Sequence, residues 1–212
     1  GSAWNNIGDA LRLLHRYDEA LDAHITARTL FGETGDTDGQ AVAWDDIGNT
    51  LEALHRYDEA LDAHITARTL YGETGDAHGQ AVAWDDIGEA LQALHRYDEA
   101  LDAHITARTL YEQTGDTHGQ GIAWNNTGSS LRGFQRYDEA VSAGGRAVEL
   151  LESLGDLTRA GDALGELARS LEAASAAPSV VRDTWLRSAS AYNSAGAIEK
   201  RDQSRANAAA SD

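Results

Sequence analysis

Apolar residues keep a helical spacing in two consecutive stretches of the chain. In residues 37–54 the stripe begins at Val42 and continues from Trp44 to Leu54 at intervals of three or four, and a second stripe begins at Tyr57. Such intervals place apolar side chains on one face of a helix. The pattern predicts two helices, over about 37–54 and 57–74, joined by a short turn at His55 to form an antiparallel hairpin.

The hairpin pattern recurs with a period of forty residues, marked by Trp4, Trp44, Trp84 and Trp124. A fixed period of this length is typical of stacked helical units, because one hairpin cannot bury its apolar face alone. We expect one array over 1–212. Its parts are repeat 1 (3–36), repeat 2 (37–76), repeat 3 (77–116), repeat 4 (117–156), a degenerate repeat 5 (157–196), and a capping helix with a tail (197–212).

Short polar and glycine signals mark the predicted helix ends. Gly75 suits the left-handed residue that ends a helix, and Asp76 can cap the next one. The equivalent steps offer two caps each, Asp36 or Thr37 and Asp116 or Thr117. Glycines also stand inside the first helix of each repeat, where glycine costs about 1 kcal/mol relative to alanine. We expect the partner helix to approach closely there; these glycines are Gly48, Gly88 and Gly128.

The fifth unit keeps only part of the pattern. Leu164 stands at the tryptophan position and Ala168 at the glycine position, and Pro178 suits a helix start. In the last segment Arg205 replaces the tryptophan. A polar outer face is what the end of a helical array requires, so we interpret this segment as a cap.

These positions resemble the tetratricopeptide repeat, W-x2-L-G-x2-Y…A-x3-F-x2-A…P. The matching residues of repeat 1 are Trp4, Ile7, Gly8, Leu11, Ala20, His24 and Ala27. Two departures are that histidine replaces the usual aromatic of the A-x3-F step (His24, His64, His104) and that the closing proline is missing. The longer unit is similar to repeats of kinesin light chains, Pins/LGN adaptors and bacterial signalling ATPases and transcriptional activators. The resemblance implies an all-α fold, a right-handed α-α superhelix (solenoid) of stacked antiparallel helix hairpins with about five repeats and a C-terminal capping helix.

Charge narrows the choice of partner. The net charge is −18, and no segment forms a basic stripe, which argues against nucleic acid and against an anionic membrane surface. Cysteine is absent, and no apolar run approaches the roughly 18 residues of a membrane span. We therefore expect a cytoplasmic protein. The acidity is greatest in the two central repeats.

The family resemblance implies that ligand contacts come from the first helix of each repeat, on the concave face. An amide there can hydrogen-bond a peptide backbone, whereas an ionised aspartate can only accept. Two Asp-Asp pairs on helices roughly 10 Å apart would form a negative strip that favours a basic peptide or a cation. The alternative is a solvated acidic groove without a ligand. The candidate residues are Asn5, Asn6, Asp9, Asp45, Asp46, Asn49, Glu52, Asp85, Asp86, Glu89, Asn125, Asn126 and Arg132.

Neither catalysis nor metal binding is expected. The chain has no G-x-S-x-G elbow, phosphate loop, cysteine nucleophile or H-E-x-x-H motif, so we predict no enzyme activity and no cofactor. His24, His64 and His104 recur one per repeat, too far apart to share an ion with bonds of about 2 Å. We expect them to pack between helices with one ring nitrogen bonded, and predict that His15, His55 and His95 lie in turns and His78 and His118 in exposed linkers.

The function that these observations predict is a protein-protein interaction module. It would bind a basic peptide or partner domain in the acidic groove, as part of a larger bacterial regulatory protein. The alternative is a self-assembling scaffold. The first helix would present the face that repeats 2 and 3 bury, so repeat ends could stack into dimers or filaments.

Overall fold

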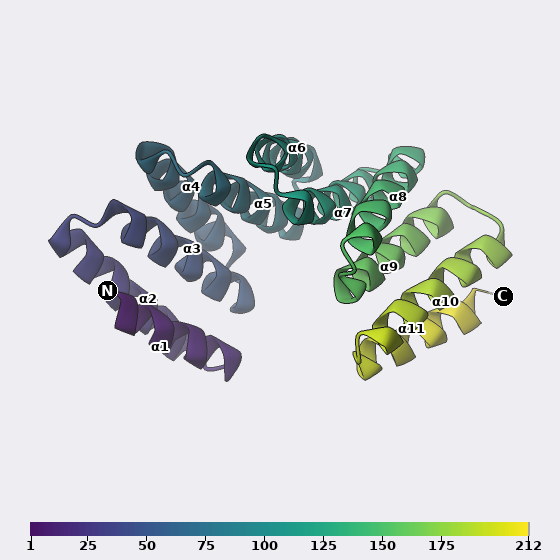
Figure 1. Cartoon of the computed structure of the whole chain (residues 1–212), viewed down its shortest axis with the longest axis horizontal. Helices are drawn as coiled ribbons and strands as arrows, with labels where there is room; N and C mark the ends of the chain where they lie inside the picture. Colours follow the sequence, from purple (N-terminus) through teal and green to yellow (C-terminus); the bar gives the residue numbers. More distant parts are fainter. Residues whose placement is uncertain (212) are drawn as a thin grey trace. The chain divides into compact units, whose positions relative to one another are not determined.

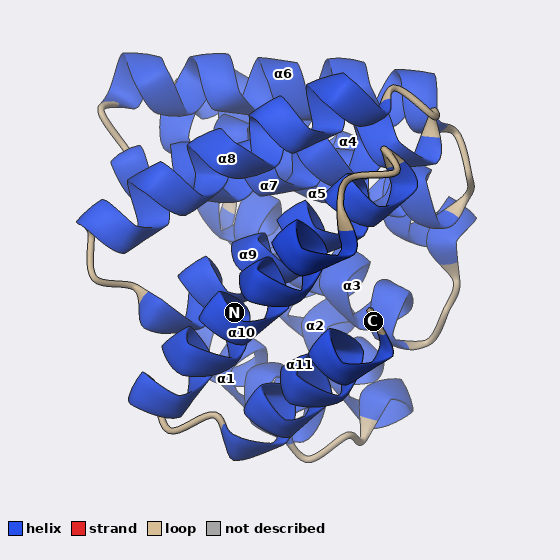
Figure 2. Cartoon of the chain, turned by 90° about the vertical axis from the view of Figure 1, so that its right-hand side faces the viewer, coloured by secondary structure: helices blue, strands red, loops and turns tan. Residues whose placement is uncertain are grey.

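The computed structural model describes residues 1–211. Within this range the chain is entirely helical, with eleven α-helices and no strand (Figure 2), which confirms the all-α fold class. Residue 212, the end of the predicted tail, lies outside the described residues. The helices are α1 (Ser2–Leu13), α2 (Tyr17–Thr34), α3 (Thr37–Ala53), α4 (Tyr57–Thr74), α5 (Ala77–Ala93), α6 (Tyr97–Thr114), α7 (Thr117–Gly133), α8 (Tyr137–Ser153), α9 (Leu157–Ala173), α10 (Pro178–Ser194) and α11 (Ile198–Ala210).

The helix boundaries follow the local signals of the sequence. His55 lies in the α3–α4 turn with φ 58°, and Gly75 ends α4 with φ 77°, in the left-handed region that glycine adopts freely. Between the two candidate caps at each step, aspartate is the one used: Asp36 and Asp116 each accept a hydrogen bond from the backbone N–H three residues on. The prediction for His78 and His118 needs a correction, because both lie in the first turn of a helix (α5 and α7) and not in linkers.

The chain divides into two compact units, residues 1–110 (unit 1) and residues 111 onward (unit 2). In unit 1, α1 to α5 pack in chain order, and α1 also contacts α3 while α3 contacts α5 (Figure 1). We call the surface formed by α1, α3 and α5 the A-helix face. In unit 2, α7 to α11 pack in the same sequential way, and α7 contacts α9 directly.

Small residues let the helices of each hairpin approach. Gly48 lies directly against the ring of His64, and a Cβ added there would sit 2.4 Å from the ring carbon Cε1. In this repeat, the part of the partner helix that approaches the glycine closely is therefore a side chain, the ring of His64. In repeat 4, where glycine replaces the histidine, a Cβ at Gly128 would instead meet the backbone of Ala140 and Gly144 at 3.4 and 3.5 Å. The His64 ring therefore requires glycine at position 48, whereas a Cβ at position 128 would be in ordinary van der Waals contact.

The degenerate fifth unit still forms a hairpin, α9 with α10. Leu164 and Ala168 are buried at the positions of tryptophan and glycine, and Trp185 is buried on α10. Pro178 is the first residue of α10. The last helix, α11, covers α10, and its Arg205 is exposed.

None of the helices in residues 1–211 combines the length and the apolar character that a membrane span requires.

Candidate ligand-binding face

Three histidines are wholly buried inside the hairpins of unit 1. His24, His64 and His104 are each 0% exposed, as expected for residues that occupy a packing position. In each, Nδ1 is hydrogen-bonded to the side chain that follows the tryptophan: to Asn5 at 3.0 Å, Asp45 at 3.0 Å and Asp85 at 2.7 Å, respectively. The prediction that one ring nitrogen is bonded to a nearby group is confirmed.

The same contacts show where three of the predicted ligand residues point. Asn5, Asp45 and Asp85 are buried and bonded to histidines of their own hairpins. Their side chains therefore serve the interior of the hairpin.

The next residue in each repeat reaches across to the preceding hairpin. Asp46 on α3 accepts a 2.7 Å hydrogen bond from Asn5 Nδ2 on α1. One repeat further on, Asp86 Oδ2 on α5 lies 4.0 Å from His64 Nδ1 on α4. Three ligand atoms, one from each of Asp45, His64 and Asp86, lie within 4.8 Å of one another. At this junction the aspartates of adjacent repeats therefore interleave with the histidine.

Burial changes the charge of this face. Desolvation raises the pKa of Asp46 to about 6, and the hydrogen bond from Asn5 opposes the rise. Desolvation also raises the pKa of Glu52 to about 7, against the opposing effect of His64. The pKa of Asp86 is raised well above its usual range by burial first and by the charge of Asp45 next. These three carboxyls are not all ionised at neutral pH, so the face is less negative than the sequence suggests.

The remaining candidates of unit 1 are more accessible. Asn6 and Glu89 are exposed, and Asn49 is half-buried. Asp9 lies 3.8 Å from the guanidinium of Arg12 on the same helix. That these side chains contact a ligand stays a prediction.

In unit 2 the candidates form a separate group. Asn125 and Asn126 are half-buried on α7. Arg132 donates through Nε to Glu166 on α9, at 2.6 Å. Arg132 therefore joins two adjacent helices, and its charge is already paired.

Sequence reasoning missed His64 as a member of the acidic cluster. Two regular spacings could have revealed it. Each buried histidine follows its Asn or Asp partner by 19 residues, and the bond from Asn5 to Asp46 spans 41 residues. Applied together, these spacings bring Asp45, His64 and Asp86 to one place.

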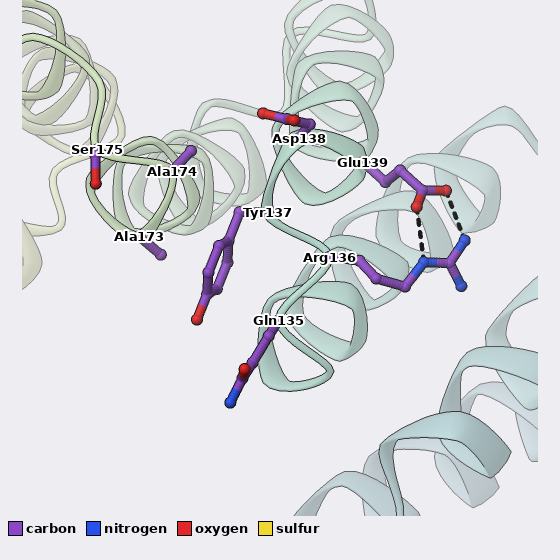
Figure 3. A pocket seen from close by; sticks show the side chains of 8 residues that line it. All are labelled: Gln135, Arg136, Tyr137, Asp138, Glu139, Ala173, Ala174 and Ser175. Atoms are coloured by element: carbon purple, nitrogen blue, oxygen red, sulfur yellow. Dashed lines mark hydrogen bonds and ion pairs between the residues drawn. The ribbon is translucent and has the colours of Figure 1, made fainter.

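Unit 2 also contains a pocket of about 490 Å³ between two helix turns (Figure 3). It is lined by residues 135–139 and 173–175, and Tyr137 lies at its centre. Its charged pair is already satisfied, because Arg136 donates to both carboxylate oxygens of Glu139 at 2.7 and 2.6 Å. The pocket is therefore a weaker candidate than the A-helix face.

The first hairpin exposes a surface that the next hairpin buries. Ile7 is 45% exposed, whereas its equivalent Ile47 is 4% exposed, and Trp4 is also exposed. That this end stacks on another chain stays a prediction.

The family is shown by comparison with protein-family models. The tetratricopeptide repeat model matches residues 1–73 and 79–153. The chain therefore belongs to the tetratricopeptide repeat family, as its tryptophan, glycine and alanine positions predicted. A comparison with curated proteins finds no match.

Solved structures share the fold at low sequence identity. The nearly identical TPR-like repeats of a kinesin light chain candidate from Podosopora anserina superpose with TM-score 0.75 at 10% identity, over 92% of this chain and 95% of that one. A signal-transduction ATPase of Pyrococcus horikoshii with a tetratricopeptide repeat sensor gives TM-score 0.77 at 12% identity, over 98% of this chain and 35% of that one. A Rap protein in complex with Competence and Sporulation Factor gives 0.70 at 15% identity, over 98% and 62%.

Proposed function

We propose that the chain is a protein-interaction scaffold whose A-helix face in unit 1 binds an extended partner segment through a cationic side chain. Membership of the tetratricopeptide repeat family supports the scaffold role. A Rap protein with a similar fold forms a complex with Competence and Sporulation Factor, which supports a binding role for this fold. The cationic preference rests on the chemistry of α3 and α5.

The observation that carries the proposal is a concentration of carboxyl groups on two contacting helices that contain no basic residue of their own. Helices α3 and α5 contain no lysine or arginine. Asp46, Glu52 and Asp86 are half-buried on these helices, and Glu89 is exposed beside them. An ammonium or guanidinium group placed here would stabilise the ionised carboxylates and offset their desolvation.

The raised pKa values give this binding a pH dependence. Because Asp46 has a pKa of about 6 and Glu52 of about 7, both must lose protons to bind a cation fully. Affinity for a cationic segment should therefore increase from pH 5.5 to pH 8. It should decrease with added salt, because part of the attraction is exposed and screened.

A labelled hexa-arginine peptide tests the proposal by fluorescence anisotropy. We expect the hexa-arginine peptide to bind at pH 8 and low salt. A hexa-glutamate peptide should not bind under the same conditions. The double variant Asp86→Asn with Glu89→Gln should weaken binding at least tenfold. The matched control removes two exposed acids from α4 and α6, Asp62→Asn with Asp102→Asn, and should change affinity no more than about twofold. Equal losses in both variants would show an effect of net charge alone and leave the face a solvated acidic surface.

A further inference from the structure

The junction between the second and third hairpins gathers metal-ligating side chains from three helices. Asp45 comes from α3, His64 from α4 and Asp86 from α5, and one ligand atom of each lies within 4.8 Å of the others. His64 is wholly buried, and the Asp86 side chain is 20% exposed. The cluster is therefore interior on one side and reached from solvent on the other.

The preceding junction shows what is missing here. There the Asn5 amide makes both contacts: its Oδ1 accepts from His24 Nδ1 at 3.0 Å, and its Nδ2 donates to Asp46 Oδ2 at 2.7 Å. Asp45 replaces this amide, and an ionised carboxylate has no hydrogen to donate. Among the described residues no donor forms a hydrogen bond with the Asp86 carboxyl; its nearest partner is His64 Nδ1, at 4.0 Å. A cation between Asp45 and Asp86 would supply the attraction that the amide supplies one junction earlier.

A second feature of the site is found on the other side of the His64 ring, at Nε2. His64 Nε2 and Glu52 Oε1 are 3.8 Å apart, and within residues 1–211 both are buried atoms without a hydrogen-bond partner. Histidines that bind a metal through one nitrogen commonly donate the other N–H to a carboxylate. If Nδ1 binds an ion, the remaining ring proton is on Nε2 and faces Glu52. Binding would thus satisfy two atoms that are otherwise unpaired.

This arrangement is specific to repeat 2. In repeat 1 the place of Glu52 is taken by Arg12, which can only donate. In repeat 3 it is taken by Gln92, whose Nε2 already lies 3.0 Å from His104 Nε2. The repeats thus give natural comparisons for a site present once in unit 1.

We propose that Asp45, His64 and Asp86 bind a divalent transition-metal ion such as Zn²⁺. The ligands are His64 Nδ1 and one carboxylate oxygen from each aspartate, and Glu52 acts as a positioning residue that accepts the Nε2–H. The Nδ1 distances of 3.0 and 4.0 Å to the two carboxylates bracket the roughly 3.4 Å between ligand atoms of a tetrahedral ion with bonds near 2.1 Å. A neutral imidazole among carboxylates favours Zn²⁺ or Co²⁺ over Ca²⁺, which prefers six or more oxygens. This proposal goes beyond the binding of a partner segment and does not require one.

Calorimetric titration of the full chain with Zn²⁺, without any peptide, tests the site. We expect one ion per chain with a micromolar or lower Kd, and at least tenfold weaker binding of Ca²⁺ and Mg²⁺. Asp86→Asn should weaken Zn²⁺ binding at least tenfold. Asp46→Asn, the same change one junction earlier, should alter it less than about threefold. Equal affinities of the two variants, or no binding to the unmodified chain, would overturn the proposal.

Three further measurements guard against misfolding and against binding by surface histidines. Circular dichroism should show equal helicity in both variants, and Co²⁺ should give visible d–d absorption bands that are lost in Asp86→Asn. Nuclear magnetic resonance of the imidazole nitrogens should show that Zn²⁺ shifts His64 Nδ1 and leaves the proton on Nε2. Shifts confined to exposed histidines such as His118 would contradict the assignment. Because no peptide is present, failure of peptide binding would leave the metal site standing, and the reverse also holds.

Discussion

Two junctions of unit 1 share one architecture but differ in chemistry. Between the first and second hairpins, the amide of Asn5 joins His24 to Asp46. Between the second and third, Asp45 bonds to His64 but can donate nothing to Asp86. The comparison teaches that such a site belongs to two neighbouring repeats together. An exchange of amide for carboxylate changes a closed hydrogen-bond chain into a pair of carboxyls beside a histidine, with no amide between them.

The largest change in stability is expected at the glycine that faces the histidine ring. Both junctions share this contact. Gly48→Ala would place a methyl group 2.4 Å from His64 Cε1, so the ring or a helix must move. We expect the free energy of unfolding to fall by about 2–3 kcal/mol, as for other overpacked cores. Urea unfolding measures the change.

The matched control for this variant is Gly72→Ala on α4. A Cβ there would meet nothing closer than 3.7 Å, so the higher helix propensity of alanine should stabilise the chain by up to about 1 kcal/mol. If Gly48→Ala behaves like Gly72→Ala, the ring of His64 is not held in a fixed place, and the shared architecture of the junctions fails.

The second-largest change in stability is expected when the amide of one junction and the carboxylate of the other are exchanged by mutation. Asn5→Asp removes the donor to Asp46 and leaves two carboxyls together, so we expect a loss of about 1–2 kcal/mol at pH 7. Asp45→Asn supplies the missing donor to Asp86 and should stabilise the chain by about 1 kcal/mol. Chemical denaturation of both variants measures the two changes. Changes of the same sign would show that the junctions do not differ as described.

The smallest effect is a dependence on pH. Asp46 has a pKa of about 6 in the folded chain, above the ordinary value of 3.8. As pH rises from about 4 to about 6, the unfolded chain loses this proton first. The free energy of unfolding therefore falls with rising pH. We expect a contribution of about 1 kcal/mol between pH 4 and pH 7, discounted for the partial exposure of the group.

Unfolding at several pH values, with and without Asp46→Asn, measures this contribution. The variant cannot ionise at this position and should show a shallower decline. Asp62→Asn, at an exposed acid of α4, is the control and should leave the slope unchanged. An identical slope in Asp46→Asn would mean that the burial of Asp46 does not govern its ionisation.

The sequence by itself determined the elements and their repetition. The forty-residue spacing of tryptophans, the capping Asp36 and the left-handed Gly75 are local signals, and helix bounds respond to local signals. The buried histidine with one bonded nitrogen was also predictable, because it occupies a packing position in every early repeat.

Only the tertiary structure decided which side chains meet across repeats. Asp45 and Asp86 are 41 residues apart, and their distance depends on how far each helix is rotated and shifted against the next. That register comes from side-chain packing between hairpins, such as the fit of His64 over Gly48. Burial also decided the protonation of Asp46, Glu52 and Asp86, because desolvation depends on what surrounds a carboxyl and not on its neighbours in sequence.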